Sequence, residues 1–257
     1  GNAIGDTLAI NVQAGTGETV DISGSEIVLA TVTITGAGGA DNLIGSATQA
    51  TTFAGGAGSD VITGGAGADI VSFIMHATEA DTITLGGGAD VVASTNATAA
   101  TVAVVTIRDF DAGTSTTIVD TLNISDAALT GLATTTNMVD TGAADVGTTG
   151  VVVHVTTDGG TITGADLTVL SQSYATDTLA LAGIKTAGSD TIDYSSNLTD
   201  NDSFLIAYQS GANVNIAVAT STAAVATTEG VDTLVTIVTL EGVTAADLNT
   251  NDFVFIA

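Results

Sequence analysis

The chain has 257 residues, enough for one or two domains, and 45% of them are hydrophobic while only 12% are charged. Asp and Glu number 28 against 2 for Lys and Arg, and the resulting formal charge of −26 excludes a nucleic-acid partner and long-range attraction to anionic membranes. Cysteine is absent, which excludes disulfides and thiolate metal sites, and no apolar run reaches the length of a membrane-inserted helix.

The first 35 residues carry short β-prone runs at 7–12, 19–23 and 27–35, separated by Gly and Ser. Such runs predict strands joined by tight turns. We interpret them as the upstream coils of a right-handed β-solenoid without bound metal. Because Gly1 is followed by neither a charged nor an apolar leader segment, we also expect a fragment or processed product without an N-terminal export signal.

Residues 55–72 contain two consecutive copies of a nine-residue unit, GGAGSDVIT and GGAGADIVS. Each follows the pattern G-G-x-G-x-D-x-U-x, in which U is apolar. The glycines permit positive φ in a compact turn, and the Asp directs a carboxylate towards the loop carbonyls. The U residue then points from a short strand into a core. The pattern therefore predicts stacked coils with acidic loops.

Degenerate copies flank the perfect pair. Upstream, GAGGADNLI at 36–44 keeps Asp41, whereas GSATQATTF at 45–53 has no acid and is expected to bind no metal. Downstream, the segments EADTIT and LGGGADVVA place Asp81 and Asp90 before apolar residues. The repeat therefore extends over a roll of several coils.

One unit forms half a coil, so loops on one side recur about every 18 residues. The spacing predicts two edges of stacked carboxylates, one with Asp41, Asp60 and Asp81 and the other with Asp69 and Asp90. Asp69 and Asp81 are farther apart than one unit requires, so we expect extra residues near 73–75 to bulge.

Stacked carboxylates repel each other. At 4 Å the repulsion is about 1 kcal/mol in water and about 4 kcal/mol at an effective dielectric constant of 20. Calcium reverses the sign of this interaction and accepts an irregular shell of carboxylate and carbonyl oxygens, whereas Mg²⁺ requires a tighter octahedron. The sequence thus predicts several Ca²⁺ ions, bound at about 10⁻⁴–10⁻³ M as in extracellular modules. The alternative is a flexible Gly-rich linker with chance aspartates, which the phased apolar residues disfavour.

From about residue 94 the glycine density falls and longer runs of Thr, Val and Ile follow. We expect strands at 101–107, 151–156, 204–208, 213–219, 233–240 and 253–256. Helical signals are short, with one or two turns expected at 125–129, 164–167 and 244–248. The predicted fold class is all-β, a parallel β-roll or β-solenoid followed by a further β-rich region with short helical turns.

Half-units of the repeat recur in this second region. Asp190 and Asp232 lie in G-x-D-x-U segments, and two interpretations stay open, namely isolated calcium sites or ordinary turns before strands. Asp120, which follows an acidic turn, is a third candidate metal ligand outside the roll. Arg108 is expected to form a local ion pair with Asp109, worth less than about 1 kcal/mol if exposed.

No motif for catalysis occurs. A zinc protease needs two His at i and i+4 with a nearby base, but His76 and His154 are the only histidines and lie far apart. A serine hydrolase would need G-x-S-x-G with a partner His, and that pentapeptide is absent. We therefore expect a protein that is not an enzyme.

The nonapeptides, the I-x-D-F-D-x-G segment at 107–113 and the segment at 248–257, in which an acidic residue precedes a short apolar run, together resemble RTX proteins, which are exported by type I secretion. The last of these resembles the family's uncleaved C-terminal secretion signal. The resemblance implies calcium ligation by the Asp carboxylates and the loop carbonyls. The residues that it designates are Asp41, Gly55, Gly56, Ala57, Gly58, Asp60, Gly64, Gly65, Ala66, Gly67, Asp69, Asp81, Gly88 and Asp90. The acid-free unit at 45–53 departs from the family pattern.

Within that family, the scarcity of Lys, Pro, Cys and Trp beside abundant Ala, Thr and Gly is most similar to bacterial surface-layer (S-layer) proteins of the stalked alphaproteobacterial type. The resemblance implies an extracellular location and a Ca²⁺-bridged homo-oligomeric lattice on the cell surface. It also implies anchoring to lipopolysaccharide through an N-terminal portion that this chain is expected to lack.

The sequence thus predicts two parts, a β-solenoid at 1–93 that includes the roll at 36–93, and a lattice-forming β-rich region at 94–257 that ends in the secretion signal. Three functions compete. The favoured one is a self-assembling surface layer. The alternatives are the calcium-folding secretion tail of an RTX hydrolase or toxin, and an adhesin.

Overall fold

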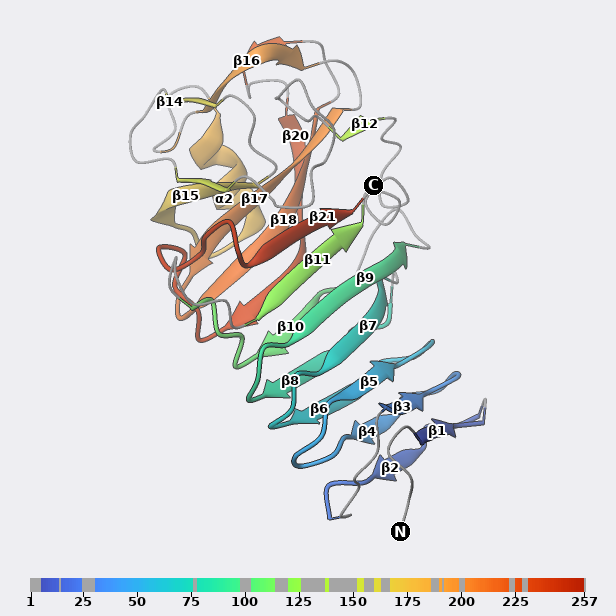
Figure 1. The fold of residues 1–257 in the computed structure, drawn as a ribbon. Coiled ribbons are helices and arrows are strands. Elements are labelled where there is room, and N and C mark those ends of the chain that lie inside the picture. The colour runs from blue at the N-terminus through green and yellow to red at the C-terminus, as the bar shows by residue number, and fades with distance from the viewer. Residues whose placement is uncertain are drawn as a thin grey trace.

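The chain forms a long coil of strands that ends in a larger β region, as the computed structural model shows (Figure 1). The structure describes residues 6–13, 15–24, 31–75, 78–97, 103–113, 120–125, 137–138, 152–154, 160–162, 167–185, 190, 192–198, 202–221, 225–227 and 231–256. The coiled part consists of two stacks of parallel strands. Each turn of the coil contributes one strand to each stack.

The first stack is a seven-stranded sheet in the order β1-β3-β5-β7-β9-β11-β21. Its members are β1 (Thr7–Asn11), β3 (Thr31–Thr35), β5 (Thr51–Ala54), β7 (Ile70–Met75), β9 (Val91–Ala97), β11 (Thr121–Ser125) and β21 (Phe253–Ile256). All neighbours in this sheet run parallel.

The second stack is an eleven-strand sheet, in which β2, β4, β6, β8 and β10 come from the coils and pair in parallel. Those five strands are β2 (Thr19–Asp21), β4 (Asn42–Ile44), β6 (Val61–Gly65), β8 (Thr82–Gly86) and β10 (Val105–Arg108). Beyond β10 the sheet continues through β20 (Val231–Glu241), β18 (Asn213–Ser221), β17 (Asp202–Ser210), β15 (Leu167–Ser173) and β13 (Val152–His154), while β12 (Asn137–Met138) pairs with β17.

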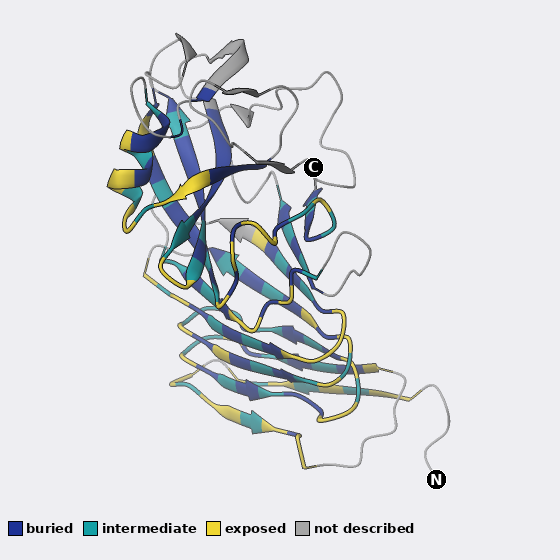
Figure 2. Ribbon diagram, turned by 90° about the vertical axis from the view of Figure 1, so that its left-hand side faces the viewer, coloured by how far each residue is buried: buried dark blue, intermediate teal, exposed yellow. Residues whose placement is uncertain are grey.

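Between the two stacks lies a core built from the U positions of the repeat. Six of these side chains are fully buried: Leu43, Phe53, Ile62, Val71, Ile83 and Val92. Their neighbours along each strand face outward, so burial alternates along the roll (Figure 2). Since each U residue moves an apolar side chain out of water, it contributes roughly 1.5–3 kcal/mol. The predicted all-β parallel roll is confirmed, including its coils upstream of residue 36.

The predicted division at residues 93/94 does not coincide with a break in either sheet. β10 continues the register of β8, and β11 that of β9, so the coil extends past the repeats. The reason is that glycine is needed only in the tight loops. The strands can therefore continue after the glycine density has fallen.

The larger β region is antiparallel at its centre, where β17 pairs with β18 and β18 with β20. A small sheet of β14 (Gly160–Ile162), β16 (Ile192–Leu198) and β19 (Val225–Thr227) lies beyond it. The helix α2 (Asp177–Ile184) contacts β20 and helps to bury a second core that contains Ile206 and Tyr208. The β strands expected at 204–208, 213–219, 233–240 and 253–256 are confirmed.

Helix α2 was missed by the sequence analysis. Thr176 caps it, its Oγ1 accepting the Leu179 N–H at 3.3 Å, and Asp177 lies in its first turn. A Thr-Asp pair before a run of Ala and Leu is a start signal that could have revealed it. The turn expected at 244–248 is present, with Asp247 N–H donating to the Thr244 carbonyl.

Two further expectations were wrong in detail. The bulge predicted near 73–75 lies instead on the neighbouring strand, because Phe73 pairs with Ser94 and Ile74 with Asn96, which leaves Thr95 as the extra residue. Arg108 does not pair with Asp109. Its Nε lies 3.2 Å from Glu241 Oε2 on the adjacent strand β20.

Asp109 instead has a positive φ of 56° and accepts the N–H groups of Leu85 and Gly86 at 2.9 and 3.0 Å. It satisfies donors of the preceding coil at a point where the chain leaves regular strand geometry. His76 and most of the predicted turns at 125–129 and 164–167 lie outside the described residues.

Candidate calcium sites in the roll

The Asp residues of alternate units form a continuous ladder along one edge of the roll. Each carboxylate accepts, through Oδ1, the backbone N–H of its equivalent in the preceding coil. Asp41 accepts from Glu18 at 2.7 Å, Asp60 from Asp41 at 2.8 Å, and Asp81 from Asp60 at 2.9 Å. The predicted first edge is therefore confirmed, and Glu18 extends it by one coil.

An equivalent ladder follows the opposite edge. Asp69 accepts from Thr51 at 2.6 Å, Asp90 from Asp69 at 2.7 Å, and Asp120 from Asp90 at 3.0 Å. Thr51 occupies the ladder position in the acid-free unit, where its hydroxyl accepts the Ser46 N–H at 3.3 Å. Asp120, a candidate from outside the repeats, is thus the end of this second ladder.

Glycine is required in these loops by backbone shape and by space. Gly56 and Gly58 have φ of 99° and 119°, which L side chains rarely adopt. At Gly55 and Gly64, which have ordinary φ, a Cβ would contact Oδ2 of Asp60 and Asp69 respectively. The first glycine of each unit therefore leaves room for the carboxylate five residues later.

The second carboxylate oxygen has no comparable partner. Among the described residues, Oδ2 is buried and accepts no hydrogen bond in Asp41, Asp60, Asp69 and Asp90. These side chains are at most 1% exposed. A buried oxygen without a donor is costly, and its repetition in four loops indicates a recurring ligand rather than a local defect.

The pKa values of several ladder aspartates are raised, which also indicates that their anionic form is unfavourable in these loops. Burial, with a smaller contribution from neighbouring carboxylates, raises the pKa of Asp60 and Asp69 to about 6 and that of Asp81 to about 7. Burial likewise raises the pKa of Asp120 to about 6. The fold thus brings acids together where the anionic form is unfavourable unless a cation compensates it.

Calcium fits this donor set. It takes six to eight oxygens at 2.3–2.6 Å in flexible geometry, and each loop offers a carboxylate oxygen together with backbone carbonyls. Among the described residues no three Asp, Glu or His side chains converge as a metal cluster. Carbonyls must therefore complete the shell, as the resemblance implies for Gly55, Gly56, Ala57, Gly58, Gly64, Gly65, Ala66, Gly67 and Gly88. When bound, the ion supplies positive charge that links successive coils.

A family model described as the RTX calcium-binding nonapeptide repeat (4 copies) matches residues 49–73 and 78–95. The roll carries RTX repeats. These repeats bind Ca²⁺ and are typical of extracellular proteins exported by type I secretion, which indicates the same broad class for this chain. No curated protein and no solved structure gives a significant match. In the described part of the chain, no helix is long and apolar enough to cross a membrane.

The candidates outside the roll have different surroundings. Asp190 is fully buried, and its carboxylate accepts hydrogen bonds from Ser171, Gln172 and Tyr174, so protein donors account for its burial. Asp232 is exposed on β20. Neither joins a ladder, and metal binding at these two positions stays a prediction.

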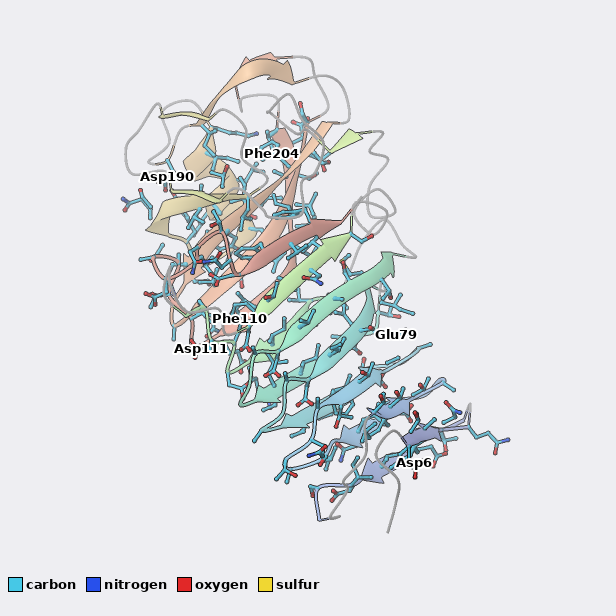
Figure 3. All side chains as sticks on the ribbon, in the orientation of Figure 1. Asp6, Glu79, Phe110, Asp111, Asp190 and Phe204 are labelled. Carbon is cyan, nitrogen blue, oxygen red and sulfur yellow. The ribbon has the colours of Figure 1, made fainter. Side chains whose placement is uncertain are left out.

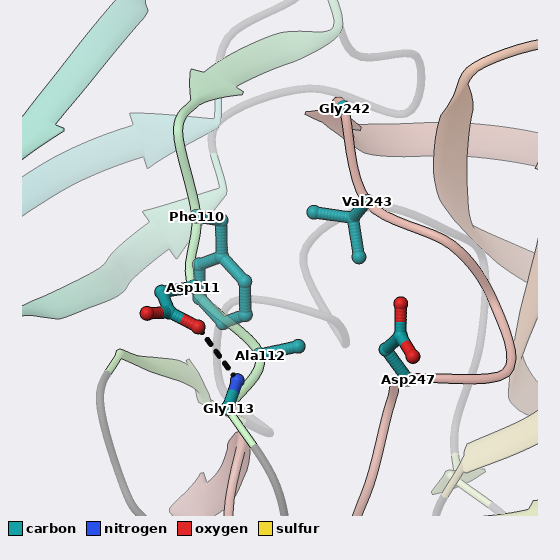
Figure 4. A pocket seen from close by; sticks show the side chains of 7 residues that line it. All are labelled: Phe110, Asp111, Ala112, Gly113, Gly242, Val243 and Asp247. Carbon is teal, nitrogen blue, oxygen red and sulfur yellow. Dashed lines mark hydrogen bonds between the residues drawn. The ribbon is translucent and has the colours of Figure 1, made fainter.

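A separate cavity of about 190 Å³ lies where the chain leaves β10 and β20 (Figure 4). Its lining residues are Phe110, Asp111, Ala112, Gly113, Gly242, Val243 and Asp247. Asp111 Oδ1 accepts the Gly113 N–H at 2.9 Å, and the Asp111 N–H donates to Asp120 Oδ2 at 2.7 Å. The cavity therefore adjoins the end of the second ladder.

Proposed function

We propose that this chain is a structural subunit of a calcium-dependent, two-dimensional crystalline surface layer on the outside of a bacterial cell. In this proposal the roll is a calcium-folded scaffold and the chain has no catalytic activity. Copies of the chain are its main partner, and Ca²⁺ is both a folding cofactor and a bridge between subunits.

The charge of the whole chain is the observation that carries the proposal. With 2 basic residues for 28 acids, most carboxylates cannot pair within the chain or with a second copy of it. Copies packed side by side would repel one another at every contact. Divalent cations in the extracellular medium remove that repulsion, and assembly then depends on the same ion as folding.

Electron microscopy tests the proposal. The purified chain is brought from chelator into millimolar CaCl₂, with MgCl₂ at the same ionic strength as the control. We expect extended ordered sheets with Ca²⁺ and none with Mg²⁺. A chain that folds in Ca²⁺ but stays monomeric at every calcium concentration would contradict the surface-layer proposal and favour a calcium-folding secretion tail.

A further inference from the structure

The loop before β8 lacks the glycines of the repeat, although its Asp81 still takes part in the hydrogen-bond ladder. Its sequence from 76 to 81 is HATEAD, without a glycine, whereas the preceding loop on the same edge is GGAGSD. Ala80 N–H donates to Ser59 Oγ at 3.0 Å, and Asp60 N–H donates to Asp81 Oδ1 at 2.9 Å. This register places Glu79 next to Gly58 of the previous coil, at a position that the repeat reserves for glycine.

The Glu79 side chain lies on the loop edge of the roll (Figure 3), and its Oε2 atom is buried. Glu79 lies two residues before Asp81, whose Oδ1 accepts the Asp60 N–H at 2.9 Å. Three carboxylates thus belong to one layer between two coils. Asp60 contributes a buried Oδ2 that accepts no hydrogen bond among the described residues.

We propose that Asp60, Glu79 and Asp81 contribute to a calcium site of higher negative charge than a site whose loop carries glycine at the position of Glu79. In this layer the Glu79 carboxylate replaces a ligand that a glycine loop would supply through its backbone. The three carboxylates do not form a metal cluster on their own among the described residues, so loop carbonyls of residues 55–58 complete the shell. Glu79 has three rotatable side-chain bonds with which to reach the ion.

The charge count sets the expected behaviour of this site. Calcium affinity rises with the number of charged ligands, so this layer should bind calcium before the layers whose loops carry glycine at the position of Glu79. Without a cation, a third carboxylate here would only add repulsion to two buried acids. The inference depends on calcium binding by the roll as a whole.

Isothermal titration of the metal-free chain with CaCl₂ tests the site. Glu79→Gln removes the charge while keeping the shape, and Asp6→Asn removes an exposed acid at the far end of the coil as the matched control. We expect Glu79→Gln to weaken the tightest site about tenfold or more and to leave the remaining sites unchanged, and Asp6→Asn to change neither. Circular dichroism in saturating calcium confirms that each variant folds.

A second variant excludes an effect of loop shape. Glu79→Gly restores the residue type of the repeat, and we expect it to weaken the tightest site as Glu79→Gln does. An isotherm unchanged in Glu79→Gln, or full affinity in Glu79→Gly, overturns the site while calcium binding by the roll stands. If the unmodified chain binds no calcium, the calcium roll itself is refuted.

Discussion

The coiled part and the antiparallel part of the molecule bury carboxylates in opposite ways. In the roll, Asp41, Asp60 and Asp90 each leave Oδ2 without a hydrogen-bond partner among the described residues. In the larger β region, which contains the antiparallel strands, the buried Asp190 carboxylate accepts the N–H groups of Ser171 at 3.0 Å and Gln172 at 3.2 Å. One region requires a cation for its buried acids, and the other supplies protein donors.

This difference indicates that calcium dependence is a local property, although the two regions share the eleven-strand sheet. The antiparallel strands β17, β18 and β20 are long, and their buried cluster consists mainly of apolar side chains together with the Tyr208 side chain. The roll has strands of three to seven residues, and in the described part of its loops several aspartates have an Oδ2 that accepts no hydrogen bond. Calcium dependence should therefore end where the coil gives way to the antiparallel strands.

Calcium removal should have the largest effect. Each site that is saturated at about 100 times its dissociation constant contributes about 2.7 kcal/mol, so the loss of several ions should unfold the roll. Hydrogen exchange with mass spectrometry should show that β4 to β9 lose protection in chelator while β17 and β18 retain most of theirs. Equal loss of protection in both regions would contradict the local dependence.

The pH dependence should reverse between the metal-free and calcium-loaded protein. Folding raises the pKa of Asp60 and Asp69 from 3.8 to about 6 and that of Asp81 to about 7. The metal-free roll is therefore most stable below about pH 4 and loses stability as pH rises to 7, by up to about 1.4 kcal/mol per pH unit for each group.

With calcium the carboxylates must be ionised to bind, so stability should rise over the same interval. Thermal unfolding at pH 4, 5.5 and 7, with and without CaCl₂, measures both slopes. Parallel slopes in the two conditions would show that the raised pKa values do not belong to the calcium sites.

The sequence was sufficient for the roll because each unit determines several features at once. Glycine positions, the sixth-position Asp and the apolar U residue all repeat with one period, so two edges of stacked acids followed directly from the spacing of Asp41, Asp60 and Asp69. The prediction failed where one period no longer governs the chain. The bulge is at Thr95, on the strand next to the expected one. Its position depends on how that strand pairs with the neighbouring coil, which the repeat pattern does not specify.

The antiparallel region shows a different limit. Its strands were predicted from Thr and Val alternation, but their partners were not, because pairing such as β10 with β20 joins residues distant in sequence. For the same reason Arg108 was assigned to Asp109 beside it rather than to Glu241. The part of Thr51 and Glu18 in the ladders was also missed, since neither residue is the Asp of the repeat.

Two glycines of the roll provide a matched pair for the next prediction. A Cβ at Gly55 would contact the Asp60 carboxylate, whereas a Cβ at Gly87 would have no heavy atom within 4 Å. Gly55→Ala should therefore destabilise the calcium-loaded protein by about 2 kcal/mol, and Gly87→Ala should change stability by less than about 0.5 kcal/mol. Thermal unfolding in CaCl₂ measures both changes in stability. Equal effects would show that the space beside the Asp60 carboxylate is not the reason why the repeat has glycine at position 55.

The smallest effect is expected at the junction of the two regions. Arg108 on β10 and Glu241 on β20 are 54% and 42% exposed, so water screens their ion pair. Arg108→Gln should cost less than about 1 kcal/mol in calcium and should not change the calcium midpoint. A larger loss of stability, together with a shift in the calcium midpoint in a chelator titration, would contradict this expectation. It would show that the contact between β10 and β20 couples calcium binding in the roll to the stability of the antiparallel strands.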